Sequence, residues 1–242
     1  MIQVILRLSK WFRQRPEDRA PASASHSETG IRIVLVGDST VTDNKGWGPG
    51  FKKLLKTGVV CINWAKSGRS SKSFINQGWW VKALAEKPDY VLIQFGHNDM
   101  PGKGPEQETD PATTYFQFMA RYVDEARAAG VKPVLVTSMT RRHFTSAGTI
   151  KSDLVPYVEA VKKLAGQKAV PLIDLHTRSI EVLNRLGPDE SREFDFGSTP
   201  GPYQQPVNSD KTHLSPKGGD VMGRIVAEDL KKVVPELGLH IE

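Results

Sequence analysis

Short apolar runs alternate with longer amphipathic segments from residue 31 onward. The runs are rich in β-branched side chains and lie at Ile31–Val36, Val59–Asn63, Tyr90–Phe95, Val134–Thr137 and Val170–Ile173. Their length and nearly continuous apolarity are typical of strands that are buried on both faces. The segments between them have helical spacing and lie at Phe51–Lys56, Gly78–Lys87, Thr113–Ala129, Leu154–Ala165, Thr177–Leu186 and Pro216–Val234.

This alternation predicts the fold class. Strands that alternate with helices form right-handed βαβ units, and several such units build an open, mainly parallel sheet with helices on both faces. We therefore expect an α/β fold around a central five-stranded sheet. Ligands of such sheets bind beyond the carboxyl ends of the strands, so the residues that directly follow each strand are the first candidates for function.

The first thirty residues have a different pattern. In Met1–Phe12, apolar side chains are interleaved with arginine and lysine, and a stretch rich in Pro, Ala and Ser follows. A secretory signal has its positive charge first and then an unbroken apolar run, whereas Arg7 interrupts the run here. We expect residues 1–30 to form an amphipathic segment and linker, and residues 31–242 to form the folded domain. The missing signal pattern favours a cytoplasmic over a secreted protein, and the segment is a candidate for an oligomer contact or a membrane-surface helix.

Composition and charge exclude several classes. The chain has 242 residues and a single cysteine, Cys61, which excludes an intramolecular disulfide and a CxxC-type zinc or redox site. No apolar run approaches the ~20 residues of a membrane span, so we expect no transmembrane segment. The net charge of +6 raises the question of a nucleic-acid partner, but the basic residues form no long run. We expect no nucleic-acid partner, and the charge is compatible with an acidic ligand.

Polar residues gather where predicted strands end. Gly37–Thr40, Asn63–Ser70 and Gly96–Asp99 follow the first three strands, and Asp210–His213 precedes the last helix. A serine hydroxyl becomes a nucleophile when an adjacent base takes its proton and a third group orients that base. Ser39, His213 and Asp210 are the candidates for these three roles.

Attack on an ester also needs donors for the oxyanion that forms. The backbone N–H groups of Ser39 and Gly68 and the side-chain amide of Asn98 are the available set. Glycine suits position 68 because the missing Cβ lets the backbone approach a ligand closely. This chemistry requires no metal and no other cofactor, so we expect none.

At this point the chain resembles a known superfamily. Gly37-Asp38-Ser39, Gly68, Gly96-His97-Asn98-Asp99 and Asp210-x-x-His213 are similar, in order, to the four sequence blocks of the SGNH (GDSL-type) hydrolases. The resemblance implies a flavodoxin-like three-layer α/β/α sandwich, with residues 31–242 as the catalytic domain. It also implies a Ser-His-Asp triad and a three-donor oxyanion hole.

Further segments resemble the rhamnogalacturonan acetylesterases, namely Gly37–Val41, Gly46–Gly48, Asn63–Phe74 and Arg141–Phe144. Thr40 stands where the lipase-like branch usually has leucine. The resemblance implies a serine esterase that removes O-acetyl groups from a carbohydrate, rhamnogalacturonan or pectin fragments above all. The alternative is an esterase, lipase or thioesterase for small aryl, lipid or other acyl esters. A binding or scaffold protein with an inactive hydrolase fold would lack a catalytic element, and none is missing.

Four residues are candidates for substrate contacts. Arg141 and Arg142 follow the fourth strand, where guanidinium groups can bind the carboxylates of a galacturonate chain. The alternative for this pair is one solvated arginine and one structural ion pair. His97 lies within the third polar segment, and Tyr203 lies in a long aperiodic segment, residues 187–212, which we expect to form part of the substrate wall.

Two tryptophans also need an interpretation. Trp79 and Trp80 are adjacent in a predicted helix. We expect them to pack in the core rather than to form a platform for sugar rings.

Overall fold

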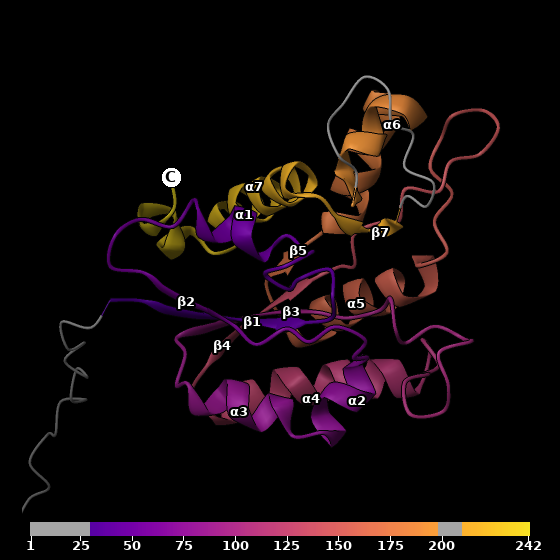
Figure 1. The fold of residues 1–242 in the computed structure, drawn as a ribbon. Coiled ribbons are helices and arrows are strands. Elements are labelled where there is room, and N and C mark those ends of the chain that lie inside the picture. Colours follow the sequence, from indigo (N-terminus) through magenta and orange to yellow (C-terminus); the bar gives the residue numbers. More distant parts are fainter. Residues whose placement is uncertain (1–29, 198–209) are drawn as a thin grey trace, which may run out of the picture.

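The computed structural model describes residues 30–197 and 210–242 (Figure 1). The segment before residue 30 and Tyr203 therefore lie outside the described residues. Within the described residues, no helix is both long enough and apolar enough to cross a membrane.

Five parallel strands form the central sheet, as predicted. They are β1 (Arg32–Gly37), β2 (Val60–Asn63), β3 (Tyr90–Gln94), β4 (Lys132–Val136) and β5 (Leu172–Ile173), in the order β2-β1-β3-β4-β5. In this order β1 lies between β2 and β3, so the chain continues to opposite sides of β1, and such a switch point is where ligands bind. Gly37 is paired with Gln94, so the segments after β1 and β3 begin side by side.

Helices cover both faces of the sheet (Figure 1), which confirms the α/β/α sandwich. One layer holds α1 (Gly48–Lys52), α6 (Leu175–Glu190) and α7 (Pro216–Val233). The other holds α2 (Ser71–Asn76), α3 (Trp79–Ala85), α4 (Thr114–Ala128) and α5 (Val155–Lys168). Short 3₁₀ helices follow α6 and α7 at Ser191–Phe194 and Pro235–His240.

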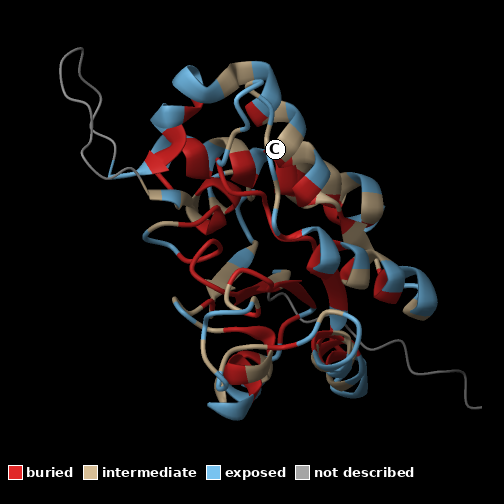
Figure 2. Ribbon diagram, turned by 90° about the vertical axis from the view of Figure 1, so that its right-hand side faces the viewer, coloured by how far each residue is buried: buried red, intermediate tan, exposed pale blue. Residues whose placement is uncertain are grey.

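The central positions of the strands are apolar because each face of the sheet has its own core. Ile33 and Leu35 of β1 pack with the first helix layer, whereas Val34 and Val36 pack with the second, and all four are fully buried. Figure 2 shows the buried residues on the strands and on the inward sides of the helices.

Helix α1 differs from its prediction, since it begins at Gly48 and ends at Lys52 rather than spanning 51–56. Close backbone packing on α7 holds it in place. A Cβ at Gly50 would lie 2.2 Å from the carbonyl oxygen of Gly219, and one at Gly223 would lie 2.3 Å from the nitrogen of Phe51. Helices that pack through glycine have no periodic hydrophobic positions, so the bounds predicted for α1 from hydrophobic spacing were wrong. Helix α2 was missed because its six residues are too few to produce a helical period.

The region predicted as aperiodic holds regular structure. Helix α6 is broken at Gly187, whose φ of +73° is not helical, so its first part ends at Leu186 as predicted and a further turn runs to Glu190. Two short strands, β6 (Asp195–Phe196) and β7 (Asp210–Leu214), form an antiparallel pair. Asp210 and His213 therefore both lie on a strand. Two-residue pairing is too short to produce an alternating pattern.

Candidate active site

A pocket of about 320 Å³ lies at the carboxyl edge of the sheet. Its lining includes every residue proposed for the triad and the oxyanion hole, together with His97 and Arg141. The full lining is Ser39, Lys45, Gly68, His97, Asn98, Lys103, Arg141, Asp210, Thr212 and His213. The structure thus brings together in one hollow residues that are distant in the sequence.

The turn that carries Ser39 is fixed by buried hydrogen bonds. Asp38 is fully buried, and its Oδ1 accepts from the backbone N–H and the hydroxyl of Thr40 at 2.8 and 2.7 Å. The Gln94 side chain donates to Thr40 Oγ1 at 2.7 Å and accepts from Trp47 Nε1 at 2.9 Å. Asp38 therefore serves as a structural carboxylate that holds the Ser39 turn against β3.

Ser39, His213 and Asp210 form a chain of short contacts. His213 Nε2 lies 2.7 Å from Ser39 Oγ, and His213 Nδ1 lies 2.5 Å from Asp210 Oδ2. The other oxygen of Asp210 accepts the backbone N–H groups of Thr212 and His213 at 2.9 and 3.0 Å. In this arrangement the ionised Asp210 can hold the proton on Nδ1, which leaves Nε2 free to accept the serine proton.

Hydrogen bonds also keep Asp210 ionised. Partial burial alone would raise its pKa, but the donors on His213 and Thr212 outweigh that effect and lower the pKa of Asp210 to about 2. The carboxylate is therefore charged throughout the neutral range.

Arg142 supports the strand that carries the triad. Its guanidinium is 2% exposed and pairs with the buried Asp195 of β6. Nη2 donates to the carbonyl oxygens of Asp210, at 2.8 Å, and of His213. The structure thus places Arg142 behind β7 and outside the pocket lining, where its guanidinium binds the backbone of Asp210 and His213. The alternative of a structural ion pair is the one observed for this residue.

Besides Ser39, the two proposed oxyanion donors, Gly68 and Asn98, lie on neighbouring loops after β2 and β3. Gly68 has a φ of +74°, which favours glycine, in a turn that Lys66 ties to β1 by donating to the Gly37 carbonyl at 2.9 Å. Asn98 donates from Nδ2 to the Arg69 carbonyl at 3.1 Å, which connects the two loops. Both residues line the pocket that contains Ser39.

Asp99 anchors the loop that carries Asn98. Its carboxylate accepts from the backbone N–H and hydroxyl of Ser71 and from the hydroxyl of Thr109. Burial raises the pKa of Asp99 to about 7, although these hydrogen bonds favour the ionised form. The side chain ties the loop after β3 to the start of α2.

His97 is the least satisfied polar group of the site. It is 2% exposed, and its Nδ1 lies 3.3 Å from Asp38 Oδ2, within ion-pair distance. The contact lacks hydrogen-bond geometry, and among the described residues neither ring nitrogen has a hydrogen-bond partner. Burial raises the pKa of Asp38, but the nearby His97 imidazole and the Thr40 donors outweigh it, so this pKa lies below its usual range.

Arg141 does reach the pocket wall. Its Nη1 lies 2.7 Å from both carboxylate oxygens of Asp153, and Nη2 donates to the His97 carbonyl at 3.3 Å. Its side chain is only 10% exposed, so the guanidinium is held in place rather than solvated.

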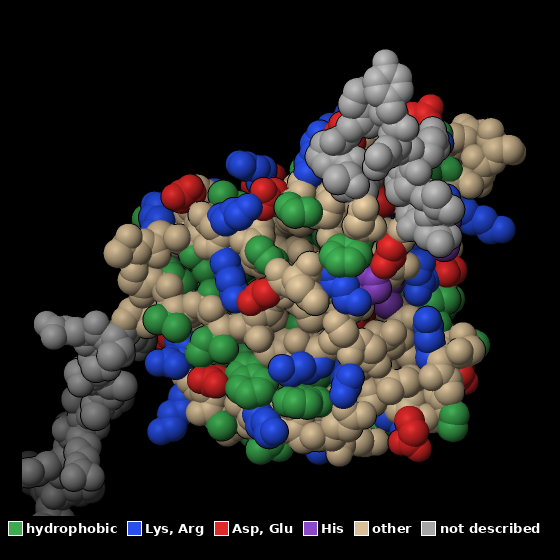
Figure 3. Space-filling model, in the orientation of Figure 1, with side chains coloured by type: hydrophobic (Ala, Val, Ile, Leu, Met, Phe, Trp, Pro, Cys, Tyr) green, Lys and Arg blue, Asp and Glu red, His purple; other side chains and the backbone are tan. Residues whose placement is uncertain are grey.

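The sequence analysis did not predict two lysines that line the pocket. Lys45 and Lys103 lie in loops after β1 and β3, and no ion pair joins either to another described residue. Nothing in their spacing sets them apart from other surface lysines. Together with Arg141 they give the pocket a basic lining, and Figure 3 shows Lys and Arg side chains on both sides of the histidines.

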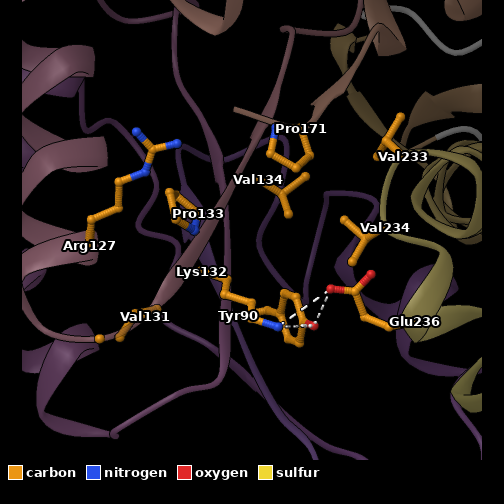
Figure 4. A pocket seen from close by; sticks show the side chains of 11 residues that line it. Tyr90, Arg127, Val131, Lys132, Pro133, Val134, Pro171, Val233, Val234 and Glu236 are labelled. Atoms are coloured by element: carbon orange, nitrogen blue, oxygen red, sulfur yellow. Dashed lines mark hydrogen bonds and ion pairs between the residues drawn. The ribbon is translucent and has the colours of Figure 1, made fainter. Parts of the chain in front are cut away.

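A second hollow, of about 370 Å³, lies at the opposite, amino-terminal edge of β3, β4 and β5 (Figure 4). There Tyr90 donates to Glu236 at 3.0 Å and accepts from Lys132 at 3.1 Å. The described residues that line it include no serine, cysteine or histidine, so it offers no nucleophile with an adjacent base.

Comparison with known proteins agrees with this geometry. Residues 35–221 match the model of the GDSL-like Lipase/Acylhydrolase family. The chain is 38% identical to the rhamnogalacturonan acetylesterase RhgT of Bacillus subtilis, across 88% of this chain and 93% of that protein. It is 35% identical to the probable rhamnogalacturonan acetylesterase YesY of the same organism, across 86% and 94%. A crystal structure of another Bacillus subtilis protein superposes with a TM-score of 0.70 at 25% identity, and the match covers 84% of this chain and 57% of that one.

Proposed function

Because the chain belongs to the GDSL-like Lipase/Acylhydrolase family, we propose that this serine esterase uses Ser39 as its nucleophile, His213 as its base and Asp210 as the group that orients the base. The observation that carries the assignment is the pair of contacts at 2.7 and 2.5 Å that joins these three side chains.

The reaction has two halves. His213 Nε2 takes the proton of Ser39 as Oγ attacks the ester carbonyl, and the oxyanion is stabilised by the N–H groups of Ser39 and Gly68 and by the amide of Asn98. The protonated His213 then gives its proton to the departing sugar hydroxyl, which leaves an acyl-enzyme. Water attacks this ester with His213 again as base, and the acid and free Ser39 are released.

The substrate we propose is an O-acetylated, uronate-containing carbohydrate of the rhamnogalacturonan type. Similarity to rhamnogalacturonan acetylesterases over most of the chain supports it. The lysines at positions 45 and 103 support it as well, because they offer cations to the carboxylates of galacturonate. We assign Arg141 and His97 to the substrate wall. We include Tyr203 on the basis of the sequence alone.

The test is a comparison of kcat/KM on acetylated rhamnogalacturonan fragments, acetylated xylan, and aryl esters of acetate and longer acyl chains. Preference for the first substrate is the expected result, with Ser39→Ala as the inactive, folded reference. A preference for longer acyl chains would favour the alternative, a lipase-like or thioesterase activity. Full activity of Ser39→Ala would refute the assigned nucleophile.

A further inference from the structure

An aromatic and basic patch lies outside the pocket, at the end of β2 and on α3. The indole rings of Trp64 and Trp79 are 6.4 Å apart, and Lys66 Nζ lies 5.3 Å from the first ring centroid and 4.7 Å from the second. Lys82 Nζ lies 4.6 Å from the centroid of Trp79. We call these four residues the tryptophan–lysine patch. Figure 3 shows large hydrophobic side chains interleaved with Lys and Arg over this part of the surface, on the face that also exposes histidine.

The two neighbouring tryptophans both pack with the second core, as expected, but they differ in burial. Trp80 is 1% exposed and donates to Glu125 from inside the second helix layer. Trp79 is only partly buried, and its Nε1 donates to Gln77 at 3.2 Å. Trp79 therefore lies at the edge of this core, where the ammonium groups of Lys66 and Lys82 lie over its ring.

The charges of the patch are not neutralised by the protein. Among the described residues, neither Lys66 nor Lys82 forms an ion pair with a carboxylate. The nearby Glu86 instead accepts from Trp64 Nε1 at 3.1 Å and lies 3.9 Å from Arg32. Two ammonium groups thus lie against indole rings without an ion pair to any carboxylate of the described residues.

Hydrogen bonds connect the patch to the pocket. Gln77 Oε1 accepts from Trp79 and also from Arg69 Nε, at 2.9 Å, and Arg69 directly follows Gly68. The carbonyl of Arg69 in turn accepts from Asn98 in the pocket. Lys66 itself belongs to the turn that contains Gly68. The loop that supplies Gly68, one of the proposed oxyanion donors, therefore continues directly into the patch.

We propose that the tryptophan–lysine patch is a subsite for uronate residues of the same chain whose acetyl ester occupies the pocket; this rests on the proposed function. The C–H face of a pyranose packs on an indole ring, and its carboxylate binds an ammonium group. Lys66 lies at the junction of the two rings, so a carboxylate bound there brings its sugar ring against either indole. The patch selects for long, acidic substrates.

The experiment compares Lys66→Gln/Lys82→Gln and, separately, Trp79→Leu with the wild type. The control is Lys231→Gln/Lys232→Gln, which removes the same charge from the far end of α7. We measure the ratio of kcat/KM for acetylated rhamnogalacturonan oligosaccharides to kcat/KM for an aryl acetate. The ratio should fall about tenfold in both patch variants and stay constant in the control. Reduction of the substrate's carboxylates to alcohols should abolish the effect of the lysine variant.

Equal ratios in all variants would overturn the proposal. A second measurement tests the subsite independently of the proposed reaction. It is the binding of deacetylated rhamnogalacturonan to Ser39→Ala, monitored by tryptophan fluorescence. Binding that the patch variants weaken supports the subsite even if the wild type prefers another ester. Absent binding, or tighter binding of single-stranded nucleic acid than of uronate oligosaccharide, would refute it.

Discussion

Replacing Arg142 with lysine separates a positioning role from substrate binding. Lysine keeps the positive charge, but one ammonium group cannot reach Asp195 and both carbonyls of β7 together. At least two hydrogen bonds from a charged donor are lost, and at about 1.5 kcal/mol or more each the free energy of unfolding should fall by about 3 kcal/mol. For a protein of this size that lowers Tm by roughly 6–12 °C.

The catalytic consequence follows from the same contacts. The carbonyls that Arg142 holds belong to Asp210 and His213, so the variant loosens the base and its partner while the pocket lining stays intact. At a temperature where the variant is folded, kcat should fall about tenfold or more with KM nearly unchanged.

The assay is steady-state kinetics on acetylated rhamnogalacturonan fragments, together with thermal unfolding. Arg141→Lys is the matched control, because Arg141 lines the pocket and pairs with the half-exposed Asp153. That variant should change KM for acidic substrates more than kcat. A rise in KM with unchanged kcat and Tm in Arg142→Lys would show that the guanidinium binds substrate.

Three further variants test other parts of the site. Asn98→Ala should lower kcat by roughly 10²–10³ with little change in KM, and an effect on KM alone would make Asn98 a ground-state contact. The raised pKa of Asp99 means that the folded state binds more protons than the unfolded state between pH 4 and 7, so stability should decline as pH rises through that range. Asp99→Asn should flatten this dependence in urea titrations at several pH values; an unchanged slope would contradict it. Deleting residues 1–27 should leave Tm and esterase activity unchanged, as measured side by side, because the sheet begins at Arg32; a loss of solubility would show that the segment packs on the domain or on a second copy.

The central sheet could be predicted because its signal is local. The side chains of Ile33–Val36 in β1 each pack in one of two cores, so this run is apolar and stands out in the sequence. Strand β7 has no such signature, since Asp210–Leu214 is mostly polar and its contacts with Asp195–Phe196 and Arg142 come from distant parts of the chain.

The part of the candidate site that directly follows strands could also be predicted. Ser39, Gly68 and Asn98 follow strands, so the topology alone brings them to one edge. The arginine pair shows the limit. Arg141 and Arg142 have the same chemistry and adjacent positions, yet one reaches the pocket and the other lies behind β7. Which neighbour faces inward depends on the position of Asp195, and no spacing in the sequence gives that position.

The glycine contacts between α1 and α7 determine more than the position of a short helix. Ser39 and His213 are 174 positions apart, and each lies in the segment that precedes one of these two helices. The backbones of α1 and α7 are in direct contact at Gly50, Gly219 and Gly223. The distance between Ser39 and His213 therefore depends on backbone contacts rather than on side chains that can change rotamer. A single methyl group added at Gly50 or Gly223, outside the pocket, would push α1 and α7 apart and so change the distance between Ser39 and His213.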